Sequence, residues 1–226
     1  MMYKKNKDNI VIFSLEHENK KENLLGQNFA KSLLEIITKL EKESELKGVI
    51  ILFTNNSSLS KYDVDSLIKF DKPDPCYEYI ESQNAILRRI EKINVPVVAA
   101  IDGSISGLNI GLALACNYRI STHKKALEFE FAEVKNGILP GYGSIARLTR
   151  IIGIEKSLDL LLNSYRFNVN EAIDFGFLDE FVSSKEDLIK RSTQWIKSNP
   201  NALQAWDREN FEFPHGDAHS SKNVPL

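Results

Sequence analysis

Residues 103–119 read GSISGLNIGLALACNYR, and they carry the strongest signal in the sequence. The stretch is built from small and apolar residues and contains no carboxylate and no histidine. Gly103, Gly107 and Gly111 recur at every fourth position of a helix-like segment. Glycine destabilises a helix unless something must come close to the backbone. The stretch therefore predicts a close approach to the main chain, with the reacting group supplied from elsewhere.

The composition is that of an ordinary globular protein. The chain has 226 residues, of which 42% are hydrophobic and 27% are charged, and its formal net charge is −2. This balance indicates neither a nucleic-acid nor a membrane partner, and we find no apolar run long enough for a signal peptide or a spanning helix. Cys76, in a proline-flanked loop, and Cys116, in an apolar run, do not suggest a disulfide framework. We therefore expect a cytoplasmic protein.

Strands and helices alternate along the chain, which is typical of α/β proteins. Short apolar runs predict strands at residues 9–15, 48–54, 95–103, 118–122, 126–131 and 177–182. Amphipathic periodicity predicts helices at residues 26–47, 77–93, 154–164, 168–176 and 184–198. Because no linker-like break interrupts the alternation, we expect one domain over residues 1–198 and an extended polar tail over residues 199–226.

Two strand-to-helix junctions could bind a ligand. They read FTNNSSLSKYDVDSL, residues 53–67, and DGSISGLN, residues 102–109. Ligands of α/β folds bind at the carboxyl ends of strands, where the first N–H groups of a helix have no intrahelical partner. Two such N–H groups directed at one oxygen form an oxyanion hole. Either junction alone could equally be a polar loop, because a glycine-rich turn is a weak signal.

Glu133 is the strongest candidate for acid–base chemistry. It lies in FAEVKNGILPGYGSIARL, residues 131–148, just past a predicted strand and among mostly apolar residues. Burial there would raise the pKa of its carboxyl group and make it a base. The alternative is an exposed loop glutamate, which is the commoner case on composition alone.

Other kinds of site find little support in the sequence. The four histidines do not form a metal-binding pattern with nearby cysteines. The glycine-containing segments GLNIG and GYG match neither a dinucleotide-binding nor a phosphate-loop pattern. Ser144, in GYGSI, does not lie in a nucleophile-elbow pattern, and no partner base is suggested. We expect no metal and no cofactor.

The order of these features resembles the enoyl-CoA hydratase/isomerase (crotonase) superfamily. The resemblance rests on PVVAAIDGSISGLNIGLALACNYRIST, FEFAEVKNGILPGYGSIARLTRIIG and NEAIDFGFLDEFV. It implies an α/β fold, a crotonase-like spiral of ββα units with C-terminal helices, assembled as a homotrimer or hexamer. It also implies an acyl-CoA thioester as substrate. The tail QAWDRENFEFPHGD is similar to the sequence that closes the hydratase region of fused fatty-acid oxidation proteins.

The resemblance also implies roles for individual residues. The backbone N–H groups of Tyr62, in SKYDVDSL, and Leu108, in SGLNIG, would form the oxyanion hole. Family hydratases use two glutamates, of which the second matches Glu133 and the first falls on Gly111. The remaining positions expected at the substrate are Lys61, Gly107, Gly111, Pro140 and Gly141.

Glycine at position 111 favours one reaction over the other. Hydration of a double bond needs one group to activate water and another to supply a proton, and the loss of one such group typically costs ~10²–10⁴-fold in rate. Moving a double bond from the 3- to the 2-position needs only one base, because the same carboxylate removes and returns the proton. The sequence therefore favours a 3-enoyl-CoA isomerase that uses Glu133. The alternatives are an enoyl-CoA hydratase or other enolate-forming thioester reaction, and a degenerate homologue that binds CoA or a partner.

Overall fold

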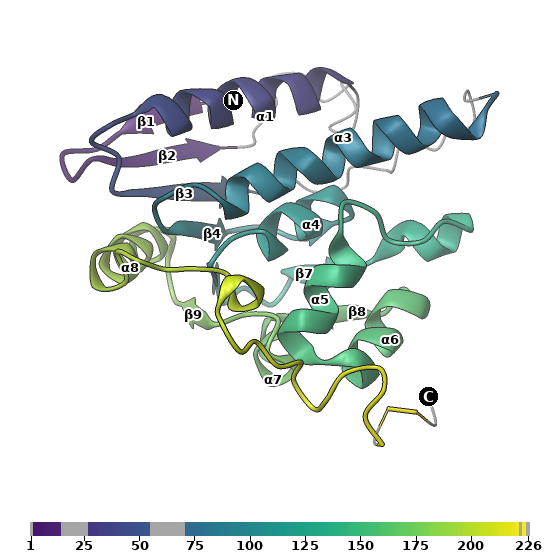
Figure 1. Ribbon diagram of the computed structural model, residues 1–226. Helices are drawn as coiled ribbons and strands as arrows, with labels where there is room; N and C mark the ends of the chain where they lie inside the picture. The colour runs from purple at the N-terminus through teal and green to yellow at the C-terminus, as the bar shows by residue number, and fades with distance from the viewer. Residues whose placement is uncertain (1, 15–26, 55–70, 222, 225–226) are drawn as a thin grey trace.

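The computed structural model describes residues 2–14, 27–54, 71–221 and 223–224. Its main sheet contains six strands in the order β1-β2-β3-β4-β6-β9, and every neighbouring pair except β1 and β2 is parallel (Figure 1). The strands span Met2–Lys5 (β1), Ile10–Ser14 (β2), Gly48–Phe53 (β3), Val97–Ile101 (β4), Tyr118–Thr122 (β6) and Glu180–Val182 (β9). Parallel pairs of this kind require long crossover connections, which the helices supply.

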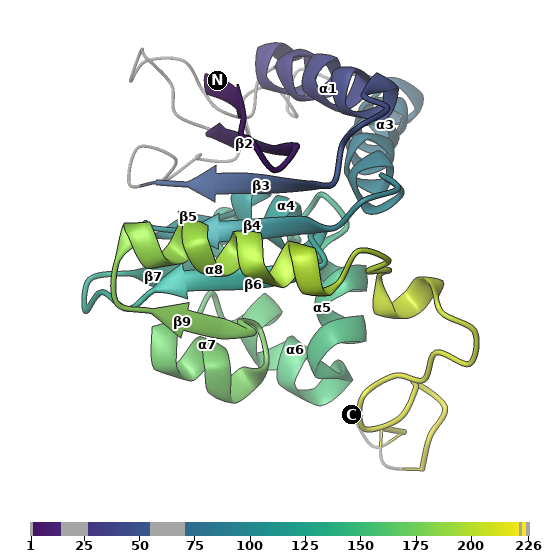
Figure 2. The same ribbon diagram turned by 90° about the vertical axis from the view of Figure 1, so that its left-hand side faces the viewer.

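Helices cover both faces of the main sheet, so β3 and β4 are buried along their whole length. Alternate side chains of a strand point to opposite faces: Ile51 packs in the core with α1 (Gln27–Lys42) and α3 (Pro73–Glu91), whereas Ile50 packs in the core with α8 (Lys185–Ser198). Figure 2 shows α8 lying across the sheet. This two-sided burial explains the continuous apolar runs of the strands.

A second sheet has three short strands in the order β5-β7-β8. They span Ile105–Ser106 (β5), Glu128–Glu130 (β7) and Arg166–Asn168 (β8). Strands β5 and β7 are parallel, and β7 and β8 are antiparallel. The remaining helical segments lie around this sheet: α4 (Leu108–Leu114), the 3₁₀ turn η2 (Ala132–Asn136), α5 (Ser144–Ile152), α6 (Ile154–Leu162) and α7 (Val169–Phe175). In the described part of the chain, no helix combines the length and the apolar character that crossing a membrane requires.

The structure corrects two details of the sequence analysis. Cys76 lies inside α3 rather than in a loop. The prolines before it do not prevent the helix, because Pro73 occupies the first turn, where the N–H that proline lacks would have no acceptor within the helix. Both cysteines are free thiols. The C-terminal segment is not simply extended: the 3₁₀ turn Ala205–Asp207 (η3) and several hydrogen-bonded turns occupy residues 205–224. The tail also contacts the domain, since the Gln204 side chain donates to the Ala115 carbonyl at 2.7 Å.

Candidate active site

The corner between β5 and α4 turns on Gly107. This residue has a φ of 57° and a ψ of −126°, a conformation that glycine adopts far more easily than other residues. The helix begins directly after it at Leu108. The first N–H groups of a helix have no acceptor within the helix, and no acceptor for the Leu108 N–H is found among the described residues. Within the part of the chain that the structure describes, the corner therefore presents a backbone donor that could bind a ligand oxygen.

The pairing of β5 with β7 places this donor near Glu133. The strands are parallel, and Ser106 of β5 pairs with Glu130 of β7. Leu108 lies two residues beyond its strand and Glu133 lies three residues beyond its own. Because the two strands are parallel, both segments leave the sheet at the C-terminal ends of the strands. The N–H donor and the carboxylate therefore lie at the same end of the sheet, where α/β folds bind ligands.

Glu133 is a buried carboxylate with no counter-charge among the described residues. Its relative exposure is 2%, and neither carboxylate oxygen has a hydrogen-bond partner among the described residues. Burial raises the pKa of Glu133 to about 6; its own backbone N–H opposes this rise, and the charge of Glu130 adds to it. Glu133 is therefore ionised at neutral pH and still accepts a proton readily, as a general base must.

Glu130, three residues earlier, shows a different environment. Lys135 donates to one of its oxygens, and the Arg166 Nε donates to the other at 2.9 Å. Glu130 is thus a structural ion-pair partner that ties η2 to β8. Of the two neighbouring acids, Glu133 alone keeps its carboxylate available for chemistry.

Gly111 lies one turn after Leu108 on α4 and contacts the turn that precedes α5. A Cβ atom at this position would lie 3.0 Å from the Tyr142 Cβ, 3.1 Å from the Ser144 Oγ and 3.3 Å from the Tyr142 carbonyl oxygen. These contacts are closer than ordinary packing allows, so a larger side chain would displace its neighbours. The turn therefore fills the space into which a side chain at position 111 would extend.

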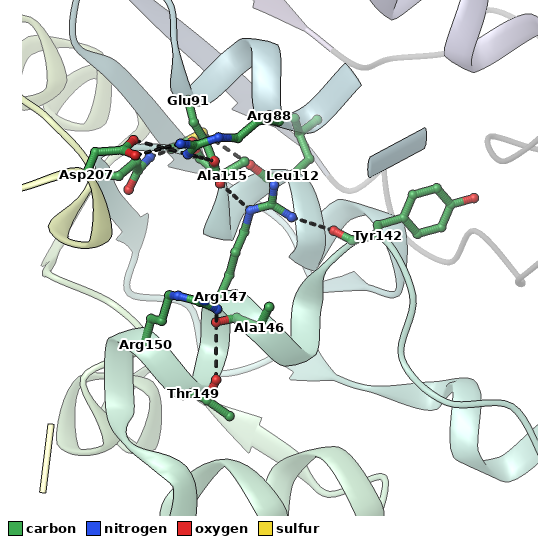
Figure 3. Close-up of polar contacts among 12 residues, drawn as sticks. Arg88, Glu91, Leu112, Ala115, Tyr142, Ala146, Arg147, Thr149, Arg150 and Asp207 are labelled. Atoms are coloured by element: carbon green, nitrogen blue, oxygen red, sulfur yellow. Dashed lines mark hydrogen bonds and ion pairs between the residues drawn. The ribbon is translucent and has the colours of Figure 1, made fainter. Parts of the chain in front are cut away.

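Arg147 holds this turn in place (Figure 3). Its Nη1 donates to the Tyr142 carbonyl at 2.7 Å, and its Nε donates to the Glu91 carboxylate. Gly143 has a φ of 66°, and a Cβ atom there would clash with the Arg147 Nη1. Glycine is thus required where the guanidinium group passes the backbone. The network fixes Tyr142 and Ser144 against α4.

The sequence matches the model of the enoyl-CoA hydratase/isomerase family over residues 6–212. The chain belongs to the enoyl-CoA hydratase/isomerase family. The fold agrees: the enoyl-CoA hydratase from Bacillus halodurans has a TM-score of 0.74 at 25% identity, covering 87% of this chain and 78% of that one. The enoyl-CoA hydratase from Bacillus anthracis has a TM-score of 0.72 at 20% identity, covering 87% and 75%.

Curated relatives of the chain are much longer proteins. The fatty acid oxidation complex subunit alpha of Shewanella frigidimarina is 27% identical over 198 residues, which cover 87% of this chain and 28% of that protein. The corresponding subunit of Shewanella amazonensis is 29% identical over 176 residues, which cover 77% of this chain and 25% of that protein. The chain therefore spans about a quarter of the length of these relatives.

The family match confirms the predicted family and the predicted crotonase-like α/β fold. Gly107, Leu108 and Gly111 lie at the corner between β5 and α4, and Glu133 follows β7, which pairs in parallel with β5. Two more predicted substrate-binding positions, Pro140, which is buried, and Gly141, whose carbonyl accepts the Ser144 N–H at 2.9 Å, lie in the turn that contacts Gly111. The other two predicted positions, Lys61 and Tyr62, lie outside the described residues, so the second oxyanion donor stays a prediction.

Sequence reasoning missed the residues that support the site. Arg147, Glu91 and Tyr142 were not identified, and Ser144 was considered only as a nucleophile. One signal was present: Arg147 lies among the inward-facing positions of an amphipathic helix, where an arginine needs a buried partner. Among the described residues, no group of three or more His, Cys, Asp or Glu side chains is arranged to hold a metal ion.

Proposed function

We propose that the protein moves the double bond of a 3-enoyl-CoA thioester to the 2-position, with Glu133 as the only base. The observation that carries this proposal is the contrast between positions 133 and 111. Glu133 is buried, unpaired and has a pKa raised to about 6, whereas Gly111 supplies no acid and leaves little room for one.

The proposed reaction begins when the thioester oxygen accepts a hydrogen bond from the Leu108 N–H, with Tyr62 as the second expected donor. The Glu133 carboxylate removes a proton from C2, and the electron pair of the broken C–H bond forms a dienolate whose charge resides largely on the thioester oxygen. Backbone donors directed at that oxygen stabilise the charge. The Glu133 carboxylic acid then returns the proton to C4, the double bond settles between C2 and C3, and the carboxylate is regenerated.

The environment of Glu133 suits this shuttle. A base is most effective when its pKa is close to the working pH, because it must both accept and release the proton. Burial raises the pKa of Glu133 towards this range, and it also keeps bulk water from the dienolate. An unpaired buried carboxylate is costly to maintain, which argues against a homologue that merely binds CoA.

Hydration of 2-enoyl-CoA is the second candidate, and the names of the solved relatives favour it. The proteins from Bacillus halodurans and Bacillus anthracis are both described as enoyl-CoA hydratases. A hydratase with two acid–base carboxylates would require another acid in place of Gly111. The three other buried acids in the described part of the chain are committed elsewhere: Glu130 to Lys135 and Arg166, Glu91 to arginines, and Asp102 to Lys124.

Purified protein should be offered matched 3-enoyl-CoA and 2-enoyl-CoA substrates while isomerisation and hydration are followed separately. We expect isomerisation to exceed hydration and to fall by ~10²–10⁴-fold in Glu133→Gln, the usual cost of losing a general base. Glu128→Gln is the matched control, because Glu128 is exposed on the neighbouring strand. Isomerisation that survives Glu133→Gln would contradict the single-base mechanism, and CoA binding without turnover would favour a binding protein.

The wider setting is also part of the proposal. The named relatives are fatty acid oxidation subunits, which supports a role in fatty-acid metabolism with an acyl-CoA substrate and no separate cofactor. Assembly as a homotrimer or hexamer and a cytoplasmic location stay predictions, the first of which sedimentation of the purified chain would test.

A further inference from the structure

Ser144 is a buried polar group in the site that the proposed mechanism does not use. Its relative exposure is 0%, and its Oγ has no hydrogen-bond partner among the described residues. A buried hydroxyl without a partner destabilises the folded protein, and most such groups in native structures are satisfied. The Ser144 hydroxyl therefore needs either a structural compensation, which the described residues do not supply, or a partner that arrives with the substrate.

The position of Ser144 indicates which part of a substrate it would meet. Its Oγ lies 3.1 Å from the point that a Cβ atom of residue 111 would occupy. Residue 111 is three positions after Leu108, which corresponds to about 4.5 Å along the helix axis. If the thioester oxygen binds the Leu108 N–H and the acyl chain follows α4 away from its N-terminus, the chain passes this turn. In that orientation the Ser144 hydroxyl lies beside the first carbons of the chain rather than beside the CoA group.

The surroundings also hold the backbone of Ser144 in place. It is the first residue of α5, and its N–H donates to the Gly141 carbonyl at 2.9 Å. The preceding turn is fixed through the Tyr142 carbonyl, which accepts from the Arg147 Nη1 at 2.7 Å. A donor that is fixed before the ligand arrives binds it without paying for reorganisation.

We propose that the Ser144 hydroxyl binds an oxygen atom attached to, or about to attack, the third carbon of the acyl chain. This inference rests on the proposed acyl-CoA function. The oxygen has two possible sources with the same chemistry, a water molecule beside a 2-enoyl chain or the hydroxyl group of a 3-hydroxyacyl chain. Ser144 would then give a single-glutamate site the means to recognise the hydrated form of its substrate.

Hydration converts the first source into the second, since water added to the 2-enoyl chain becomes the 3-hydroxyl group. In hydration, a lone pair of water forms the C3–O bond while the C2–C3 π bond breaks. Because position 111 supplies no second acid, Glu133 must act twice: its carboxylate accepts a proton from the water, and the resulting carboxylic acid donates a proton to C2. We therefore expect hydration to be slower than isomerisation. The Ser144 hydroxyl only holds the oxygen; it neither gains nor loses a proton over the cycle.

The test compares dissociation constants for 3-hydroxyoctanoyl-CoA and octanoyl-CoA, which differ only in the oxygen. Both are measured by calorimetry in Glu133→Gln, so that no turnover occurs, with and without Ser144→Ala. We expect the preference for the hydroxylated chain to fall about two- to tenfold in Ser144→Ala, the worth of one neutral hydrogen bond. Ser192→Ala is the control, because the Ser192 hydroxyl is buried on α8 and bonds the Leu188 carbonyl of its own helix.

A second measurement separates a binding role from a structural one. Ser144→Ala removes an unpaired buried hydroxyl, so the melting temperature should stay the same or rise. A lower melting temperature with an unchanged preference for the hydroxylated chain would show a structural serine and overturn the proposal. If octanoyl-CoA itself does not bind, the proposed function fails and the role of Ser144 fails with it, whereas binding with an unchanged preference overturns the role of Ser144 alone.

The source of the oxygen follows from rates measured with Glu133 intact. If water is bound, the ratio of hydration to isomerisation falls in Ser144→Ala. If that ratio stays constant while the binding preference falls, the partner is the 3-hydroxyl group of the chain. Both results support a Ser144 hydroxyl that binds oxygen at the third carbon.

Discussion

Two buried carboxylates in this molecule have opposite surroundings. Glu91, at the end of α3, is 7% exposed and is held between the guanidinium groups of Arg88 and Arg147 (Figure 3). Glu133, after β7, is 2% exposed and has no partner among the described residues. Burial alone does not distinguish the two groups; the presence of counter-charges does.

The difference distinguishes a carboxylate that stabilises the fold from one that is available for catalysis. A buried carboxylate costs several kcal/mol unless it is paired and hydrogen-bonded. Glu91 meets that requirement, and its network reaches the Tyr142 carbonyl through Arg147. Glu133 does not meet it, and the rise in its pKa is a consequence of this unfavourable burial. Buried acids left in this unpaired state are candidates for function, whereas paired acids hold the frame around them.

Arg147→Ala should have the largest effect on stability. The substitution removes a cation from Glu91 and a donor from the Tyr142 carbonyl, which leaves a buried charge partly uncompensated. Breaking a buried pair in this way costs about 3–5 kcal/mol in the free energy of unfolding, measurable by urea denaturation. Arg150→Ala is the matched control, because Arg150 bonds the Ala146 carbonyl of its own helix and contacts the Phe213 ring with its guanidinium carbon 5.5 Å from the centroid. A loss below 1 kcal/mol in Arg147→Ala would show that Glu91 does not depend on this pair.

Glu133→Gln should stabilise the protein while it lowers the activity by ~10²–10⁴-fold. The pKa of Glu133 is raised from its ordinary value of 4.5 to about 6, so at pH 7 the ionised group destabilises the folded state by about 2 kcal/mol. The penalty disappears as the pH falls, because the folded protein takes up a proton below pH 6 and the unfolded chain does so only below 4.5. Denaturation of both forms should give a difference of about 2 kcal/mol at pH 7 that falls below 1 kcal/mol at pH 5.

An equal difference at both pH values would contradict this account, since a gain that does not depend on ionisation would come from packing. The activity should follow the same ionisation. In the proposed mechanism the base form of Glu133 starts the reaction, so the rate at low substrate concentration should fall as the pH drops below about 6 and level off above it.

Much of the fold and the central part of the site were predictable from the sequence. The strands of the buried sheet were predicted within a few residues because continuous apolar runs leave little choice of structure. Glu133 was identified because it follows a strand in an apolar setting, and the corner at Gly107 was identified from its glycines. The short strands β1, β5 and β8 were missed because two to four residues carry no periodic signal.

The supporting residues could not be predicted because their partners are distant in the chain. Arg147 and Glu91 are separated by 56 positions, and Arg88 and Asp207 by 119 positions. Nothing in the local pattern around Gly111 reveals that Tyr142 and Ser144 pack against it. Tertiary contacts decide such matters, and a single sequence does not display them.

Asp207→Asn should have the smallest effect. Asp207 binds the outer end of the Glu91 network, with its Oδ1 2.6 Å from the Arg88 Nη2 and 3.0 Å from the Lys92 Nζ. The Asp207 side chain is only 10% exposed, but its partners Arg88 and Lys92 are 41% and 57% exposed, so water replaces much of what the carboxylate provides to them. Pairs of this kind contribute about 0.2–1 kcal/mol.

The same substitution tests whether this ion pair holds the C-terminal tail against the domain. Limited trypsin digestion after Arg208 reports local release of the tail, because cleavage requires the backbone to leave the surface. Gln204→Ala is the comparison, since the Gln204 side chain is buried and its loss leaves the Ala115 carbonyl without its donor. We expect faster cleavage in Gln204→Ala than in Asp207→Asn. If Asp207→Asn instead destabilised the protein as much as Arg147→Ala does, the Arg88 end of the network would be shielded from water as fully as the Arg147 end. Solvent exposure would then no longer explain why Glu91 matters more to stability than Asp207.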